Sequence, residues 1–215
     1  MYQPPKVIER CTSSRGELQL QQRDEHFEII YNGTFLMATY NGESERVLVQ
    51  AITEKLMKPS KLLIGGLGVG FSLEEALKSD QVIRVDVLEI EKAIIDWNER
   101  YLKKMNKAAL QDPRTNIIHA DLIEHIIKTD EKYDGVCLDI DNGPDWTVVE
   151  MNDGLYSTKG ILALKRIIAK GGYLSFWSAT KSSHFVDKLK GHFKHVEVYA
   201  IEQPKGEPDF VYVCY

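Results

Sequence analysis

The sequence has few cysteines, no cluster of basic residues and no long apolar run. Its three cysteines, Cys11, Cys137 and Cys214, include no C-x-x-C pair, so neither a disulfide framework nor a zinc knuckle is expected. The net charge of -5 is spread along 215 residues, which argues against a nucleic-acid partner. No stretch approaches the roughly 18 apolar residues needed to cross a bilayer. Since the first residues also lack the apolar core of a secretory signal, we expect a cytoplasmic protein without a membrane partner.

From residue 61 onward, short apolar runs alternate with segments of helical spacing. The expected strands are 62–65, 84–89, 116–119, 135–139 and 173–177, and the expected helices are 71–78, 91–103, 122–128 and 157–169. Such alternation predicts an α/β fold with a doubly wound, mostly parallel sheet. Runs 196–201 and 210–214 are joined by too few residues for a crossover helix, so they predict a C-terminal antiparallel hairpin. This is the plan of the class I methyltransferase-like Rossmann fold.

The first 44 residues have a different pattern. Strand-like runs at 17–21, 27–31 and 34–40 are separated by turn residues that include Asn32-Gly33, a strong hairpin signal. We therefore expect a small β appendage over 1–44 and a Rossmann-like nucleoside-binding domain over 45–215. The larger part would open with a helix at 46–57, which Pro59 ends.

A glycine cluster follows the first strand of the larger part. It contains Gly65, Gly66, Gly68 and Gly70, and the acid that ends the next strand is Glu89. Glycines let the backbone approach a ligand closely, and a carboxylate accepts hydrogen bonds from ribose hydroxyls. A dinucleotide loop would place its third glycine one residue later. The spacing favours a sulfonium nucleoside of the S-adenosylmethionine type, with a dinucleotide site and a purely structural turn as the alternatives.

Other acids stand at or just after the ends of expected strands, where α/β sheets bind ligands. Asp121 could bind an adenine amino group, and its neighbour Leu122 would lie in the same site. Ile90 would likewise lie in the site beside Glu89, the acid that could bind ribose. The alternative for Asp121 is to cap the following helix, and we expect only one of the two roles.

Asp139 and Asp141 follow a buried strand and precede a Gly-Pro turn. Two carboxylates this close raise one pKa unless a cation lies between them. An amine substrate would be such a cation, and a carboxylate could take its proton. We therefore expect Asp139 and Asp141 to be catalytic, with a solvated turn as the alternative.

The remaining candidates favour structural roles. His192 and His195 form H-x-x-H at a predicted helix end, without a third ligand nearby, so no metal is expected. Trp177 lies in an expected strand and is more typical of core packing than of a binding pocket.

Taken together, these segments resemble the polyamine aminopropyltransferases typified by spermidine synthase. The resemblance rests on the order and spacing of short segments at 16–20, 32–35, 63–66, 88–91, 112–114, 132–134, 138–139 and 143–144. It implies that Glu89 binds ribose, Asp121 binds adenine, and Asp139 binds or deprotonates an attacking amine. It also implies a small-molecule amine substrate, decarboxylated S-adenosylmethionine as the group donor and, by analogy, a homodimer.

The chain departs from the family's usual pattern at three places. Gly68 stands where the family usually has an Asp that holds the donor's amino group. Ser44 and Glu45 replace a Tyr-His pair, and the loop after Asp139 is shorter by about two residues. Three alternatives follow: aminopropyl transfer as the first choice, methyl transfer from intact S-adenosylmethionine, or nucleoside binding without turnover.

Overall fold

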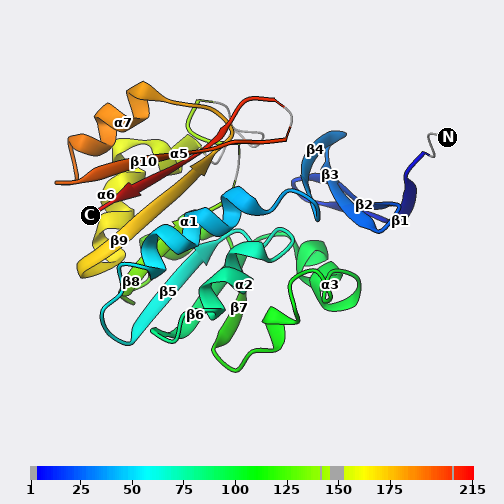
Figure 1. Cartoon of the computed structure of the whole chain (residues 1–215), viewed down its shortest axis with the longest axis horizontal. Coiled ribbons are helices and arrows are strands. Elements are labelled where there is room, and N and C mark those ends of the chain that lie inside the picture. Colours follow the sequence, from blue (N-terminus) through cyan, green and yellow to red (C-terminus); the bar gives the residue numbers. More distant parts are fainter. Residues whose placement is uncertain (1–3, 141, 146–152, 205) are drawn as a thin grey trace.

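The computed structural model of the chain describes residues 4–140, 142–145, 153–204 and 206–215, and it contains two separate β-sheets (Figure 1). Four antiparallel strands form the N-terminal sheet: β1 (Lys6–Ser13), β2 (Gly16–Arg23), β3 (His26–Tyr31) and β4 (Thr34–Ala38). Neighbouring strands along the chain pair in this sheet, as expected for hairpins. Asn32 and Gly33 have positive φ angles of 48° and 77° in the turn between β3 and β4, which explains the strong hairpin signal there.

Seven strands form the second sheet, in the spatial order β10-β11-β9-β8-β5-β6-β7. They are β5 (Ser60–Gly65), β6 (Val82–Glu89), β7 (Thr115–His119), β8 (Tyr133–Leu138), β9 (Ile168–Ser178), β10 (Val196–Ile201) and β11 (Asp209–Cys214). Strands β5 to β9 pair in parallel, whereas β11 is antiparallel to both β9 and β10. The predicted mostly parallel sheet with a C-terminal hairpin is confirmed.

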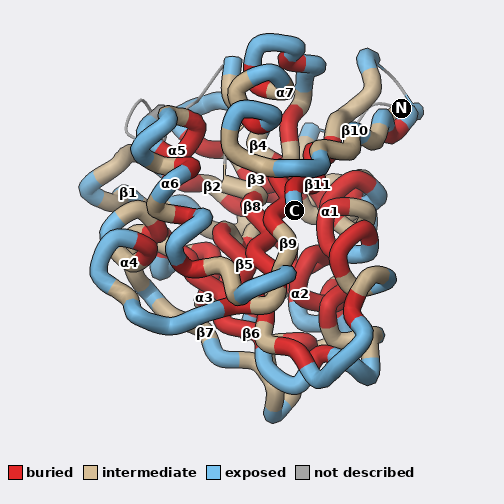
Figure 2. Tube along the Cα trace, turned by 90° about the vertical axis from the view of Figure 1, so that its left-hand side faces the viewer, coloured by how far each residue is buried: buried red, intermediate tan, exposed pale blue. Residues whose placement is uncertain are grey.

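Helices cover both faces of the large sheet. They are α1 (Glu43–Thr53), α2 (Phe71–Leu77), α3 (Lys92–Arg100), α4 (Leu122–Lys128), α5 (Asp153–Tyr156), α6 (Thr158–Ile167) and α7 (Ser183–Lys190), with a 3-10 turn, η1, at Ala109–Gln111. Figure 2 has α1 and α2 on one side of the central strands and α4 and α6 on the other.

Two apolar cores follow from this layering. Leu62 and Ile64 of β5 pack into the core shared with α1 to α3, and Leu63 between them packs into the core shared with α4, α6 and α7. Successive strand side chains point to opposite faces, so a strand covered on both faces is apolar throughout. Cys137 and Cys214 are buried in these cores, as predicted.

Three predicted helices end two or more residues earlier than their apolar spacing indicates. The helix predicted over 46–57 is α1, which begins at Glu43 and ends at Thr53, and the buried Leu56 lies beyond its end. The helix predicted to reach residue 103 ends at Arg100, because Leu102 is fully buried in the turn that follows and so continues the apolar pattern. The helix predicted to reach residue 169 ends at Ile167, since Ile168 already pairs with Tyr133 as the start of β9. In all three cases, buried or strand-forming apolar residues beyond the end of the helix made the predicted helix too long.

Four elements, β1, η1, α5 and α7, were absent from the prediction. Strand β1 has mostly exposed or half-buried side chains, so it lacks a clear alternation of apolar and polar residues. Helix α7 begins after Ser182, whose hydroxyl accepts a hydrogen bond from the backbone N–H of Phe185 at 3.2 Å. That cap is a recognisable start signal.

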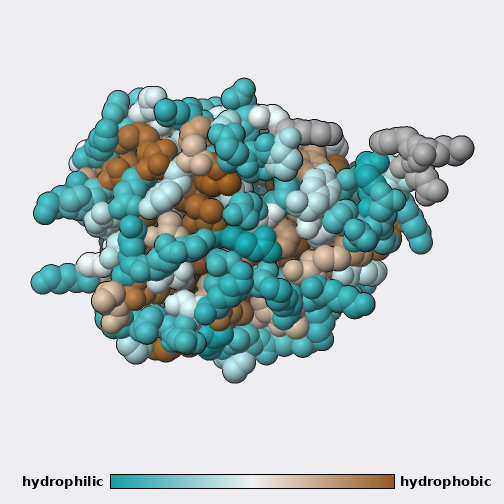
Figure 3. All heavy atoms as spheres, in the orientation of Figure 1, coloured by the Kyte–Doolittle hydropathy of each residue, from teal (hydrophilic) through white to brown (hydrophobic). Residues whose placement is uncertain are grey.

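Hydrophilic residues cover most of the face shown in Figure 3, with hydrophobic residues between them in smaller areas. Most of the large apolar side chains are buried. Among the described residues, no helix has both the length and the apolar character that a membrane span requires.

Candidate functional site

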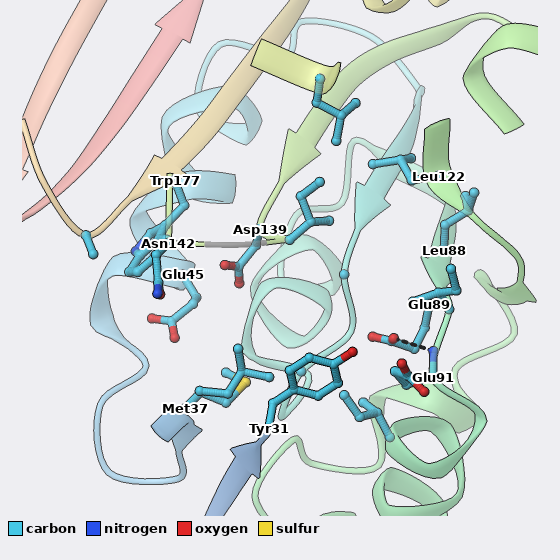
Figure 4. A pocket seen from close by; sticks show the side chains of 18 of the residues that line it. Tyr31, Met37, Glu45, Leu88, Glu89, Glu91, Leu122, Asp139, Asn142 and Trp177 are labelled. Atoms are coloured by element: carbon cyan, nitrogen blue, oxygen red, sulfur yellow. Dashed lines mark hydrogen bonds between the residues drawn. The ribbon is translucent and has the colours of Figure 1, made fainter. Parts of the chain in front are cut away.

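A cavity of about 420 Å³ lies at the carboxyl ends of β5, β6 and β8, where the N-terminal sheet meets the large sheet (Figure 4). The chain continues from β5 to β6 on one side and returns to β8 on the other, so these strands flank the topological switch point of the sheet. Open α/β sheets bind ligands at this point. The cavity is therefore the candidate site.

The glycine loop after β5 forms the floor between β6 and β8. The Gly66 N–H donates to the Leu88 carbonyl at 2.9 Å, and the Asp139 N–H donates to the Gly65 carbonyl at 2.9 Å. Gly66 has a φ of 91°, and a Cβ on it would lie 2.0 Å from the Asp139 carbonyl oxygen. Only glycine permits this close approach.

The predicted loop glycines have different positions. Gly66 and Gly68 line the cavity. Gly65 ends β5, and Gly70 caps α2 in a left-handed conformation with a φ of 93°. These two shape the loop and are not among the residues that line the cavity.

Met37 of β4 covers Gly68 from the N-terminal sheet. Its sulfur accepts a hydrogen bond from the Val69 N–H at 3.1 Å, and a Cβ on Gly68 would lie 2.3 Å from the same sulfur. A thioether thus fills the space in which the resembling family usually carries an Asp side chain.

The Glu89 side chain forms hydrogen bonds both to the glycine loop and to the turn before α3. Its Oε2 accepts from the Leu67 N–H at 3.0 Å and its Oε1 accepts from the Glu91 N–H at 2.8 Å. Burial raises the pKa of this carboxyl, against the lowering effect of the two backbone donors. Each carboxylate oxygen retains a lone pair, so Glu89 can still accept a ligand hydroxyl. Ile90 lines the cavity beside it.

Asp121 both caps a helix and faces the cavity. Its Oδ1 accepts from the Glu124 N–H at 3.1 Å, and its Oδ2 lies 3.5 Å from Arg15 Nη1. The capping role is therefore observed, and Asp121 also lines the cavity, so its adenine-binding role stays a prediction. Leu122 lines the cavity next to Asp121.

Asp139 directly follows β8 and lines the cavity. Burial raises its pKa well above the usual range, and the charges of Glu45, Asp209 and Glu89 raise it further. The sequence analysis expected one raised pKa from the closeness of Asp139 and Asp141, but Asp141 lies outside the described residues, and the acids that raise the pKa of Asp139 come from elsewhere in the chain.

Glu45 and Asp209 are site residues that sequence reasoning missed. The Ser44 hydroxyl lies 2.7 Å from Asp209 Oδ2 and 3.0 Å from Glu45 Oε2, and the Gln203 amide donates to Asp209 Oδ2 at 2.6 Å. Burial and the charge of Asp209 raise the pKa of Glu45 to about 7. Ser44 and Asp209 are 165 positions apart, so no local pattern could have paired them.

Trp177 packs against the apolar core shared with α1 to α3, as expected, and it also lines the cavity. It is partly buried, and its indole N–H has no hydrogen-bond partner in the described part of the chain. Tyr31 of β3 also lines the cavity, and its hydroxyl donates to the Arg15 carbonyl at 2.9 Å. The alternating strand pattern could not separate a pocket wall from a core position.

In the described ranges, no group of three or more His, Cys, Asp or Glu side chains is arranged to hold a metal ion. The acids of the cavity are spread around it instead: Glu89 and Glu91 lie on one side in Figure 4, and Glu45 lies on the other, nearer Asp139. This arrangement suits a ligand with a polar sugar at one end and positive charge at the other.

Two solved structures share the fold. A spermidine synthase in complex with the transition state analogue AdoDATO aligns with a TM-score of 0.80 at 20% identity, covering 97% of this chain and 73% of that one. Spermidine synthase from Thermotoga maritima aligns with a TM-score of 0.79 at 19% identity, covering 97% and 72%. At these identities the likeness establishes the class I methyltransferase-like fold.

Curated relatives share the sequence as well. The polyamine aminopropyltransferase of Pyrobaculum calidifontis is 23% identical over 87% of this chain and 68% of the relative. The enzyme of Pyrobaculum aerophilum is 26% identical over 68% of this chain and 53% of the relative. The enzyme of Saccharolobus solfataricus is 35% identical over 44% of this chain and 32% of the relative. The chain thus spans about half the length of the Pyrobaculum aerophilum relative.

The family profile of the spermine/spermidine synthase domain matches residues 44–204. This range begins in the first turn of α1 and ends after β10, so it contains the glycine loop, Glu89, Asp121 and Asp139. The matched range covers most of the chain and all of the parallel strands at whose ends the cavity lies. The chain therefore belongs to the spermine/spermidine synthase family.

Proposed function

We propose that the protein is an aminopropyltransferase that moves the aminopropyl group of decarboxylated S-adenosylmethionine to a small-molecule amine. The observation that carries this proposal is that Glu89, the glycine loop and Asp139 line the same cavity, with the loop between the two acids. Family membership and the names of the relatives support aminopropyl transfer over the methyltransferase and non-catalytic alternatives.

In this reaction the amine nitrogen attacks the carbon next to the sulfonium sulfur. The carbon–sulfur bond breaks, its electron pair stays on sulfur, and neutral methylthioadenosine leaves. The new secondary ammonium gives its extra proton to a base. Because the donor is already activated, the protein mainly aligns the reactants and receives the proton.

Asp139 suits the role of base. Its carboxylate faces the cavity, and burial among other acids raises its pKa. A carboxylate with a raised pKa is a better proton acceptor near neutral pH. The nucleoside would lie toward Glu89, with ribose hydroxyls donating to its free lone pairs and Ile90 and Leu122 against the adenine.

Product analysis tests the proposal. The wild-type protein, decarboxylated S-adenosylmethionine and 1,4-diaminobutane should yield methylthioadenosine and the amine extended by one aminopropyl unit, detected by mass spectrometry. Asp139→Asn should lower kcat about 10²- to 10⁴-fold, while Asp130→Asn, a fully exposed control, should not change it. Methylthioadenosine formation at the wild-type rate in Asp139→Asn, or S-adenosylhomocysteine as the only nucleoside product from the intact compound, would contradict the proposal.

A homodimer and a cytoplasmic location are further proposals, made by analogy with the family. Light scattering after size-exclusion chromatography would test the first, with a mass of twice 24.6 kDa as the expected result. Fractionation of cells that produce the protein would test the second.

A further inference from the structure

Two buried asparagines contact the glycine loop without being among the residues that line the ligand cavity. Asn98 lies in the last turn of α3, and Asn106 lies in the turns between α3 and η1. Their exposed fractions are 1% and 0%. Asparagine is mostly exposed in proteins, because its amide is costly to bury unless it is hydrogen-bonded. The bonds that these two amides form therefore indicate what they do.

Both side chains donate to backbone carbonyls of the glycine loop. Asn98 Nδ2 donates to the Gly68 carbonyl at 2.7 Å, and Asn106 Nδ2 donates to the Val69 carbonyl at 3.3 Å. Asn106 Nδ2 also donates to Asn98 Oδ1 at 2.8 Å, and Asn98 Nδ2 donates to the Ile94 carbonyl within α3 at 2.9 Å. An NH₂ group has two hydrogens, so every donor hydrogen of the pair has a partner.

The Asn98 bond fixes a peptide unit that could otherwise rotate. The carbonyl of this unit belongs to Gly68, and its N–H belongs to Val69 and donates to the Met37 sulfur at 3.1 Å. Gly68 has a φ of 50°, and a glycine has many other backbone conformations open to it. Because α3 holds the carbonyl and β4 holds the N–H, the peptide cannot turn over without losing both bonds.

The same loop contacts the proposed nucleoside site. Gly66 and Gly68 line the cavity, and the Leu67 N–H donates to Glu89 Oε2 at 3.0 Å. A rotation of the peptide after Gly68 would also displace Leu67, and so would disturb the acid to which the proposed function assigns the ribose. A loop that is already held in its bound shape loses less freedom when the ligand binds.

The amide pair is present although it leaves one polar atom without a partner. Asn106 Oδ1 is buried and accepts no hydrogen bond within the described ranges. A buried acceptor of this kind destabilises the folded state, and an apolar side chain of similar shape would avoid that cost. Packing alone therefore does not explain an asparagine at this position, whereas its two donor bonds do.

We propose that Asn98 and Asn106 are positioning residues that hold the glycine loop in the shape that binds the nucleoside. They act through the carbonyls of Gly68 and Val69 and contact neither reactant. This inference rests on the proposed function. It predicts that the affinity for the nucleoside depends on the two amides, while the rate of the chemical step does not.

Calorimetric titration with methylthioadenosine tests the inference. Asn98→Ala and Asn106→Ala should each weaken binding about 3- to 10-fold, which is the effect of one buried hydrogen bond. Ser175→Ala is the matched control, because the fully buried Ser175 hydroxyl donates to the Leu48 carbonyl of α1 at 2.9 Å. This variant loses a comparable bond away from the loop and should bind methylthioadenosine as the wild type does.

Asn98→Asp tests the hydrogen bond itself. A carboxylate has the shape of the amide but donates no hydrogen, whereas the protonated acid donates one. Burial should raise the pKa of this new carboxyl. Compared with the wild type at the same pH, Asn98→Asp should bind methylthioadenosine weakly at about pH 8 and recover at about pH 5.5, while Asn98→Ala should stay weak at both. Parallel pH profiles for the two variants would contradict the inference.

Steady-state kinetics give a second readout. With decarboxylated S-adenosylmethionine and 1,4-diaminobutane, Asn98→Ala should raise the donor's KM about 3- to 10-fold and leave kcat within about twofold. A fall in kcat at an unchanged donor KM would overturn the inference, because the amide would then affect the reacting groups instead of the nucleoside.

The outcomes separate this inference from the proposed function. Wild-type affinity for methylthioadenosine in both alanine variants would overturn the inference alone, as would an equal loss in Ser175→Ala, because affinity would then follow general stability. If Asn98→Ala did not fold, Asn106→Ala and Asn98→Asp would decide in the same titration. If the wild-type protein bound neither methylthioadenosine nor the decarboxylated donor, the proposed function would fall, and this inference with it.

Discussion

Glu89, Glu45 and Asp139 have different surroundings in this cavity, although burial raises the pKa of all three. Glu89 accepts two backbone N–H groups, which favour its charged form. Burial raises the pKa values of Glu45 and Asp139, and the charge of Asp209 raises both further, while a backbone hydrogen bond and the Ser44 hydroxyl act to lower that of Glu45. The first environment suits a fixed acceptor for hydroxyls, and the second suits binding a cation or a proton.

Glu89→Gln should weaken methylthioadenosine binding about 10- to 100-fold and destabilise the protein by about 1–3 kcal/mol. In the wild-type protein the N–H groups of Leu67 and Glu91 each donate to a different oxygen of Glu89. In the variant an NH₂ group replaces one of these oxygens, so one backbone N–H would face another donor. Calorimetric titration and urea unfolding measure the two effects. Glu99→Gln on exposed helix surface is the control, and wild-type affinity in Glu89→Gln would exclude Glu89 from the nucleoside site.

Glu45 should make stability fall as pH rises from about 5 to about 8. Its pKa is about 7 in the folded protein against an ordinary 4.5, so the folded state holds a proton that the unfolded state has already lost. This advantage, on the order of 1–3 kcal/mol, is present near pH 5 and is lost as pH rises through 7.

The difference in unfolding free energy between wild type and Glu45→Gln isolates this effect, because other titrating groups are common to both proteins. From about pH 5 to about pH 8 the unfolding free energy of the wild type should fall relative to that of Glu45→Gln. The difference in unfolding free energy between the wild type and Glu43→Gln, a variant at an exposed acid of α1, should not change with pH. Parallel pH profiles for wild type and Glu45→Gln would show that Glu45 titrates normally.

At the level of elements, the loop after β5 is the part that brings the two ends of the cavity together. It passes close to Asp139 at Gly66, bonds to Glu89 at Leu67 and lies under Met37 at Gly68. Three elements distant in sequence thus contact one short loop. A displacement there would disturb the nucleoside side and the reacting side at once.

Gly66→Ala should destabilise the protein more than Gly171→Ala, by about 2 kcal/mol or more. Both glycines have positive φ angles, 91° and 77°, but a Cβ on Gly66 would meet the Asp139 carbonyl at 2.0 Å, while one on Gly171 would meet nothing within 4 Å. Gly171→Ala therefore measures backbone strain alone. Urea unfolding compares the two variants, and equal losses of stability would indicate that the loop can move away from Asp139 at little cost.

Local sequence patterns predicted the elements well where burial follows a regular period. Helix 122–128 matches α4 in both bounds, and the glycine loop lies where its spacing indicated. The site was predicted in part: Glu89, Asp121 and Asp139 do line one cavity. Glu45 and Asp209 were missed as site residues, because they come together only where β11 packs against α1.

At the scale of the whole molecule, the N-terminal sheet completes the cavity that the large sheet begins. The Ser13 hydroxyl at the end of β1 donates to Glu91 at 3.1 Å, and Arg15 lies 3.5 Å from Asp121. Farther out, Arg100 of α3 pairs with Glu9 of β1 at 2.7 Å. These contacts place Tyr31 and Met37 over the glycine loop, so the site depends on both sheets.

The donor preference of the whole protein tests the central claim most directly. Purified protein is titrated calorimetrically with decarboxylated S-adenosylmethionine, the intact compound and methylthioadenosine in one buffer. An aminopropyltransferase should bind the decarboxylated donor more tightly than the intact one, because an added carboxylate would enter a cavity already lined by Glu45, Asp139 and Asp209. Tighter binding of intact S-adenosylmethionine would contradict the account and indicate methyl transfer or sensing instead.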